Sequence, residues 1–156
     1  MVNHRLSFII YQPGFTLIEL LIVIVIIGIL AALSGIGLAG ARQSARDSRR
    51  KADLENIRSG LEIYKADCND YPAALPAVGS DLVGDGTPTT CALANTYISS
   101  VQGDPNNPSR IYLYNRISLT QYEICAALEQ GSGSVTCGGS SSCGTGVTCN
   151  FRVINP

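Results

Sequence analysis

One carboxylate interrupts the apolar amino-terminal part of this 156-residue chain. Glu19 follows the segment Gly14-Phe15-Thr16-Leu17-Ile18 and precedes a long run without any charged residue. A carboxylate inside a hydrocarbon layer costs about 3 kcal/mol to insert, so we expect Glu19 to need a positively charged partner. An anchor that only holds a protein in a bilayer has no use for this residue. A device that joins the carboxylate of one subunit to a cation of another subunit does.

The uncharged run extends from Leu20 to Ala41, which is 22 residues. A helix rises about 1.5 Å per residue, so this run is long enough for the roughly 30 Å hydrocarbon core of a bilayer. It therefore predicts a membrane-spanning helix. An ordinary signal anchor with an accidental glutamate is the alternative interpretation. A secretory signal peptide fits less well, because the long apolar run follows Gly14 instead of preceding a cleavage site.

The residues from Gly14 to Val23, Gly-Phe-Thr-Leu-Ile-Glu-Leu-Leu-Ile-Val, resemble the processing and methylation motif of type IV prepilins and type II secretion pseudopilins. In that family a membrane peptidase cuts after the glycine and methylates the new amino terminus. The resemblance implies cleavage between Gly14 and Phe15, N-methylation of Phe15, and pairing of its amino group with Glu19 of a neighbouring subunit. Residues 1–14 are then a leader, residues 15–41 a transmembrane and filament-core helix, and residues 42–156 an extracytoplasmic domain.

The helix is expected to continue beyond the apolar run to about residue 68, with Pro72 shortly after its end. Leu54, Ile57, Leu61 and Tyr64 recur at helical spacing and form one apolar stripe. Opposite charges four residues apart, Asp47–Lys51 and Arg58–Glu62, predict ion pairs on the solvent side of residues 42–68.

The segment 69–109 is rich in Pro, Gly, Ala and Thr and is expected to be a loop. Beyond it, three β-prone runs at 110–115, 121–126 and 147–154 predict antiparallel strands within 110–156. The first two are separated by a short connection typical of a hairpin. The predicted fold class is α+β: the lollipop of the pilin family, with a long amino-terminal helix packed on a small antiparallel sheet.

All six cysteines lie beyond the apolar run, at Cys68, Cys91, Cys125, Cys137, Cys143 and Cys149. An even number in one short exported domain indicates disulfides formed in an oxidising compartment. The sequence leaves the pairing open, and Cys68–Cys91 is our first choice because it would close the proline-rich loop onto the end of the helix. A zinc site is disfavoured, because no Cys-x2-Cys spacing occurs and the sole histidine is His4.

Two signals disagree about orientation. The positive-inside tendency would place the residues after the apolar run in the cytoplasm, because five basic residues follow it closely. These are Arg42, Arg46, Arg49, Arg50 and Lys51. The cysteines and the processing motif require the opposite orientation, and we follow them, since charge bias is statistical whereas the motif is chemical.

The second half carries a further resemblance. Tyr64-Lys-Ala-Asp67 with Tyr71-Pro72, and Asp104-Pro105 ahead of Tyr112-Leu-Tyr114, are similar to the major pseudopilin of type II secretion. That pseudopilin binds calcium in a loop between its late strands. The corresponding stretch here, 131–146, has no acidic residue, so the calcium site does not carry over. Asp81 and Asp85 are weak calcium candidates, since loop carboxylates with backbone carbonyls suit hard cations.

No catalytic constellation is evident, and no cofactor is expected. The preferred function is a structural subunit of a type II secretion pseudopilus; the alternative is a major type IV pilin of a surface pilus used for adhesion, twitching motility or DNA uptake. A membrane-anchored binding protein that never polymerises does not explain Glu19 or the cut site.

The implied partners are other copies of the chain, prepilin peptidase, an inner-membrane assembly platform with its cytoplasmic ATPase, minor pilins or pseudopilins, and the lipid bilayer before assembly. The implied location is the inner membrane, single-pass, and then a periplasmic or surface filament. A net charge of −1 gives no sign of nucleic-acid binding.

Overall fold

The computed structural model describes residues 14–155, except for the side chains of residues 34–37, and residues 1–13 of the expected leader lie outside this range. In chain order the elements are α1 (Leu17–Cys68), β1 (Leu82–Val83), β2 (Thr96–Ile98), β3 (Leu113–Ser118), β4 (Gln121–Ala126) and β5 (Phe151–Ile154). A long helix followed by small antiparallel sheets confirms the α+β class. The chain divides into two compact units, Met1–Ala39 and Gly40–Pro156.

In the first unit α1 is apolar on every side. The large apolar side chains from Leu17 to Leu33 are all exposed, with exposed fractions of 47–84%. Among the described residues no single helix is both long enough and apolar enough to span a membrane. One bent pair of helical segments satisfies both criteria when taken together, namely Leu17–Leu33 and Leu38–Cys68.

The carboxyl end of α1 is set by local chemistry. Asn69 takes a left-handed conformation (φ 65°), and its N–H donates to the carbonyl of Lys65 at 2.9 Å. Asparagine tolerates this conformation and satisfies one of the last helix carbonyls. Pro72 follows and cannot continue the helix, because its ring lacks the N–H donor and clashes with the preceding turn. The helix therefore ends at Cys68.

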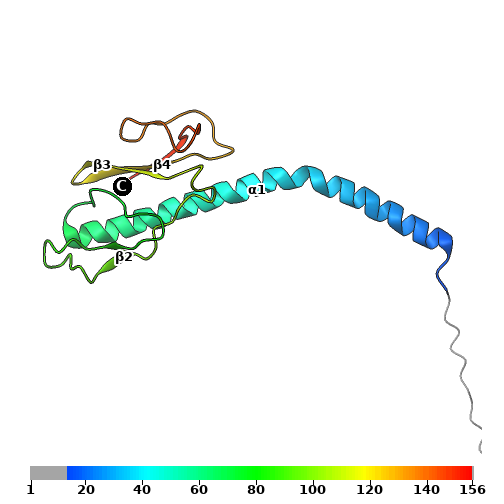
Figure 1. Cartoon of the computed structure of the whole chain (residues 1–156), viewed down its shortest axis with the longest axis horizontal. Helices are drawn as coiled ribbons and strands as arrows, with labels where there is room; N and C mark the ends of the chain where they lie inside the picture. The colour runs from blue at the N-terminus through cyan, green and yellow to red at the C-terminus, as the bar shows by residue number, and fades with distance from the viewer. Residues whose placement is uncertain (1–13, 156) are drawn as a thin grey trace, which may run out of the picture. The chain divides into compact units, whose positions relative to one another are not determined.

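The second unit has one main core, and the predicted stripe of α1 forms its helical side. Leu54, Ile57 and Leu61 have no exposed surface, and Tyr64 is buried as well. They belong to one cluster with Ile124 and other buried side chains of β4 and β5. Figure 1 shows β3 and β4 alongside this half of α1. Burying each of these aliphatic side chains stabilises the fold by about 1.5–3 kcal/mol.

The three-stranded sheet has the order β3-β4-β5, and both pairs are antiparallel. In the β3–β4 hairpin Asn115 lies opposite Glu123 and Ser118 opposite Gln121. Successive side chains of a strand point to opposite faces of the sheet. Ile124 therefore packs in the core beside α1, and the neighbouring Cys125 packs on the opposite face. The sheet therefore has one face on the helix and one face for the carboxy-terminal segment.

The segment 69–109 differs from the expected loop, because it contains the antiparallel pair β1–β2. Each of these strands is two or three residues long, too short to give a periodic sequence signal. The pair is held against α1 at Gly60: a Cβ there would lie 2.2 Å from Cγ1 of Ile98. Only glycine leaves room for β2 to approach the helix this closely.

Disulfides hold the loop and the carboxy-terminal segment. The structure joins Cys68 to Cys91, which ties the end of α1 to the loop that follows it. The other pairs are Cys125–Cys137 and Cys143–Cys149, and all six cysteines are buried. The four later cysteines and Ala127 form a second core on the outer face of the sheet. The segment after β4 thus gains a core that its Gly- and Ser-rich sequence cannot supply by itself.

We expect peptide mapping of the unreduced full-length chain to recover the three pairs Cys68–Cys91, Cys125–Cys137 and Cys143–Cys149. The geometry requires these partners, since cysteines must have Cα atoms within about 7 Å to form a bridge, and the observed Cα distances are 4.6, 6.1 and 5.0 Å. Trapping free thiols with iodoacetamide before digestion controls for exchange. Peptides linking Cys68 to any of the four later cysteines would contradict this arrangement.

Candidate functional site

The amino-terminal motif begins outside the helix. Gly14, Phe15 and Thr16 precede the first helical residue, Leu17, and have no regular secondary structure. Phe15 is 84% exposed. Among the described residues, a Cβ added at Gly14 would meet no atom within 4 Å. The fold itself therefore does not require glycine at position 14, and the peptide bond between Gly14 and Phe15 is accessible.

Thr16 and Glu19 form a reciprocal cap on the first turn of α1. The backbone N–H of Thr16 donates to Oε2 of Glu19 at 2.9 Å, and the Thr16 hydroxyl donates to the same oxygen at 2.7 Å. In return the N–H of Glu19 donates to the Thr16 hydroxyl oxygen at 3.3 Å. This is a capping box, in which a threonine and a glutamate three residues later satisfy helix donors that would otherwise lack partners. A carboxylate also suits the positive end of the helix dipole.

Only one of the two carboxylate oxygens of Glu19 is used in this cap. Within the described residues Oε1 accepts no hydrogen bond, whereas Oε2 accepts both bonds from Thr16. An ionised carboxylate offers about four lone-pair sites. The cap therefore holds the side chain in place and leaves one oxygen for a further donor.

A second concentration of charge lies at the start of the second unit and is centred on Arg50. Its guanidinium has no exposed surface. It forms a two-pronged contact with Asp104, in which Nε donates to Oδ2 at 2.7 Å and Nη2 to Oδ1 at 3.1 Å. Its Nη1 donates to Asp47 at 2.7 Å and to Glu129 at 3.0 Å. One side chain of α1 thus binds the loop before β3 and the segment after β4.

The carboxylates around Arg50 are well supplied with donors. The backbone N–H groups of Glu129 and Gln130 donate to Asp47 at 2.8 and 2.9 Å. Burial opposes the charge of Asp47, but these bonds and the guanidinium of Arg50 outweigh it and lower the pKa of Asp47. Hydrogen bonds from Arg46, despite partial burial, lower the pKa of Glu129 to about 2. Both acids are therefore ionised at neutral pH.

The predicted surface ion pairs Asp47–Lys51 and Arg58–Glu62 do not form. Asp47 is buried and binds Arg50. Arg58 lies 3.5 Å from Glu55, and Glu62 instead accepts hydrogen bonds from the hydroxyls of two core tyrosines, Tyr71 and Tyr122. Burial together with the bond to Glu62 raises the pKa of Tyr71 to about 12. The prediction was wrong because four-residue spacing alone does not reveal which side of the helix the fold covers.

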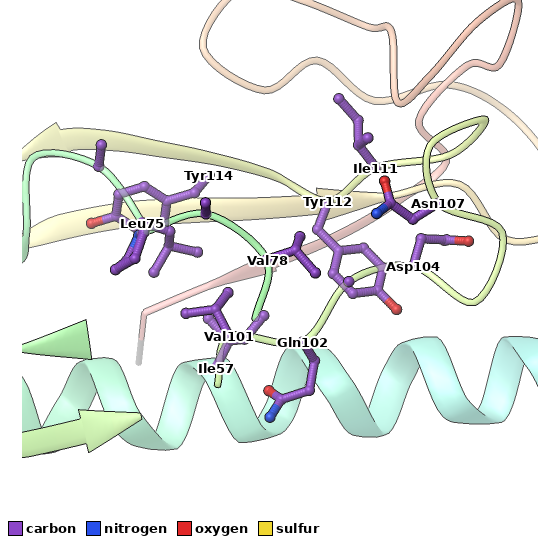
Figure 2. Close-up of a pocket in the computed structure, with 14 residues that line it drawn as sticks. Ile57, Leu75, Val78, Val101, Gln102, Asp104, Asn107, Ile111, Tyr112 and Tyr114 are labelled. Carbon is purple, nitrogen blue, oxygen red and sulfur yellow. The ribbon is translucent and has the colours of Figure 1, made fainter. Parts of the chain in front are cut away.

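An apolar hollow of about 360 Å³ lies between α1 and the loops that follow it. Figure 2 shows Val78, Val101 and Tyr112 gathered beside the helix, with Tyr114 and Leu75 further along the hollow. The lining contains no serine, cysteine, histidine or lysine. The Tyr112 hydroxyl donates to Asp53 at 2.9 Å and Asp104 binds Arg50, whereas Oε1 of Gln102 is buried without a hydrogen-bond partner among the described residues.

The weak calcium candidates have local partners. Asp81 accepts the N–H of Ser100 and Asp85 accepts the N–H of Thr87, each at 2.8 Å. In the described part of the chain, these two aspartates do not belong to a common group of potential ligands. Asp85 lies close to Cys68 and Cys91, but those sulfurs are joined to each other and are not available as thiolate ligands.

Comparison with known protein families gives one match, which covers the amino-terminal residues. Residues 11–35 match the family model described as the prokaryotic N-terminal methylation motif. The chain carries a prokaryotic N-terminal methylation motif. The match includes Gly14, Phe15, Thr16 and Glu19, the residues that form the exposed peptide bond and the helix cap.

Three similar proteins are all named type II secretion system core protein G. The one from Escherichia coli K12 is 34% identical over 96 residues, which is 60% of this chain and 66% of that protein. The protein from Dickeya chrysanthemi is 36% identical over 77 residues, 49% of this chain and 50% of the relative. The protein from Pectobacterium carotovorum is 42% identical over 62 residues, 40% of each chain. The chain thus spans 40–66% of the length of these relatives, and no solved structure matches it.

Replacing Arg50 by methionine should lower the free energy of unfolding by about 3–5 kcal/mol, because the variant leaves buried carboxylates without their cation. Arg49 is the matched control: it is the preceding residue, its side chain is 67% exposed, and its nearest carboxylate oxygen is 3.9 Å away. Arg49→Met should change stability by less than about 1 kcal/mol. Guanidinium unfolding of the detergent-solubilised full chain measures both. Equal losses in the two variants would contradict the role assigned to Arg50.

The stability of the second unit should fall in acid. Glu129 is ionised in the folded chain down to a pKa of about 2, whereas an unfolded glutamate titrates near about 4.3. Its contribution is therefore complete above the unfolded value and is lost as the pH falls through the folded value. Thermal unfolding between pH 6 and pH 2 checks this, with Glu129→Gln as the control that should show a shallower loss. An identical pH profile for Glu129→Gln would refute it.

Proposed function

We propose that this chain is a structural subunit of a helical filament, the major pseudopilin of a type II secretion system. The observation that carries the proposal is the first unit: a capped carboxylate at the start of a helical segment whose large apolar side chains are all exposed. So large an apolar surface calls for lipid or other protein chains around it. The similarity to core protein G and the methylation motif support the same assignment.

In the proposed function the chain exists first as a membrane-anchored subunit and then as part of a filament. Before assembly, residues 15–41 anchor it in the inner membrane, single-pass, with residues 42–156 outside the cytoplasm. After prepilin peptidase has cut between Gly14 and Phe15 and methylated Phe15, an assembly platform and its ATPase move the subunit into a periplasmic filament with minor pseudopilins. The chain is a building block and not an enzyme.

A major type IV pilin of a surface pilus is the second candidate. It is favoured by one observation, the carboxy-terminal segment folded around Cys125–Cys137 and Cys143–Cys149. Such a disulfide-held segment resembles the carboxy-terminal region of many pilins and suits a filament that is exposed outside the cell. The two candidates share the amino-terminal site and differ in where the filament is found.

Glu19 can act in assembly without losing its place in the cap. Its Oε2 accepts both bonds from Thr16, so the free Oε1 is held in a fixed position at the start of the helix. In a filament the amino group of a neighbour's Phe15 would meet this oxygen in a low-dielectric core. The contact offsets the desolvation of both charges only where the geometry is good. A subunit added out of register would leave both charges unpaired.

The processing step is tested by Gly14→Val in a strain that lacks the native gene. We expect mass spectrometry to find the leader still attached and the secretion of exported enzymes to be lost, because the peptidase needs a minimal side chain at the cut. Gly28→Val is a processing control in the same unit; a Cβ there also meets no atom within 4 Å, and its leader should be removed. Normal cleavage of Gly14→Val would exclude the assigned site. Lost surface pili with intact secretion would favour the pilin alternative.

The role of Glu19 is tested by separating its charge from its cap. Glu19→Gln retains an acceptor for Thr16 but has no charge, so it should be inserted and cleaved yet yield few filaments. Thr16→Val removes the hydroxyl and weakens the cap by about 0.5–2 kcal/mol while the charge stays, so filaments should still form. Electron microscopy of sheared material and immunoblots of the membrane fraction give both readouts. Abundant filaments from Glu19→Gln together with none from Thr16→Val would show that the cap matters and the charge does not.

A further inference from the structure

The basic residues that follow the apolar run fall into two groups, those paired with carboxylates inside the fold and those exposed on the surface. Arg50 is buried among carboxylates, and Arg46 donates to Glu129. Arg42, Arg49 and Lys51 remain on the surface. The sole acid between residues 41 and 52 is Asp47, and it is buried. The outward surface of this part of α1 therefore carries cations and no exposed carboxylate.

A polar hollow of about 360 Å³ opens on this surface. One wall is a single face of α1, since Ser44, Ser48 and Lys51 are spaced by four and three residues. The other wall comes from the segment after β4, with Gln130, Gly131 and Ser132. Within the described part of the chain, the three serine hydroxyls form no hydrogen bond.

Asp47 also lines this hollow, but its charge is directed into the fold. Its Oδ1 accepts bonds from Arg50 and from the N–H of Glu129, and its Oδ2 accepts the N–H of Gln130. What the hollow offers to a ligand is the ammonium of Lys51 and the serine hydroxyls, because the side-chain amide of Gln130 already donates to the carbonyl of Gly40 at 3.3 Å. Lys51 lies 5.7 Å from the centre of the Phe151 ring, a cation–π contact that holds its position. Such donors suit an anion whose oxygens only accept hydrogen bonds, namely a phosphodiester.

The position of the hollow along the chain indicates the source of that anion. Ser44 lies three residues after Ala41, the end of the uncharged run, which is about 4.5 Å along a helix. The headgroup layer extends about 5–8 Å beyond the hydrocarbon on each side of a bilayer. Lys51 lies seven residues further along α1, about 10.5 Å, and lines the same hollow as Ser44.

We infer that the hollow formed by Ser44, Ser48, Lys51, Gln130 and Ser132 binds the phosphodiester headgroup of an anionic phospholipid while the subunit waits in the membrane. This inference rests on the proposed function, because it places residues 15–41 in a bilayer. The bound lipid fixes the height of the second unit above the bilayer and must be released when the subunit joins a filament.

Native mass spectrometry of the full-length chain in detergent, titrated with phosphatidylglycerol or phosphatidylcholine, tests the inference. The native chain should retain phosphatidylglycerol about tenfold more tightly than phosphatidylcholine. Ser44→Ala/Ser48→Ala/Lys51→Ala should reduce this preference to about twofold or less. Lys65→Ala is the control, since Lys65 also lies over an aromatic ring, that of Tyr71 at 4.8 Å, but far along α1 from the hollow; it should keep the preference.

Three outcomes would overturn the inference: no preference for phosphatidylglycerol in the native chain, an unchanged preference in the triple variant, or displacement of the lipid by an equimolar amount of inorganic phosphate. The last would identify a site for free phosphate instead of lipid. Filament formation by the native chain is measured in parallel. Normal filaments without lipid preference would reject the lipid site alone, whereas lipid preference without filaments would reject the proposed function and leave the site.

Discussion

The carboxylate of Glu19 lies in the first turn of an apolar helical segment, and the assembly of the chain depends on how its charge is compensated. Its neighbours in the chain can satisfy it only in part, because Thr16 supplies two neutral donors to one oxygen and no positive charge. In a low-dielectric environment an uncompensated carboxylate is costly, whether lipid or other helices surround it. The cation must come from outside the helix, and in the proposed filament it is the amino group that cleavage creates at Phe15.

The second unit also contains a buried charge, but its partners belong to the same chain. Arg50 is buried, yet three carboxylates and their backbone donors surround it, so neither sign is left unpaired. The ion pairs of Arg50 bear on the orientation of the chain, for which the positive-inside tendency disagrees with the cysteines and the processing motif. Of the five basic residues after the apolar run, Arg46 and Arg50 serve the fold by binding acids from distant parts of the chain. Their presence is therefore weak evidence for a cytoplasmic location of residues 42–156.

Sequence reasoning reached the features that have local or periodic causes. The stripe Leu54–Tyr64 predicted the helical side of the core, and Pro72 predicted the end of α1 near residue 68. It missed what depends on contacts between distant residues. Nothing in the four-residue spacing of Asp47 and Lys51 shows that loops at Asp104 and Glu129 cover that side of the helix. The capping role of Thr16 has a sequence signal of its own, a threonine three residues before a glutamate.

In the proposed filament, a second copy of the chain compensates the charge of Glu19. A cryo-electron microscopy map of the filament at side-chain resolution tests it most directly. We expect the nitrogen of Phe15 in one subunit to lie within about 4 Å of a carboxylate oxygen of Glu19 in its neighbour, with Thr16 still bonded to the other oxygen. A filament in which Glu19 contacts only its own Thr16, with every Phe15 nitrogen far from it, would exclude this charge pairing between subunits.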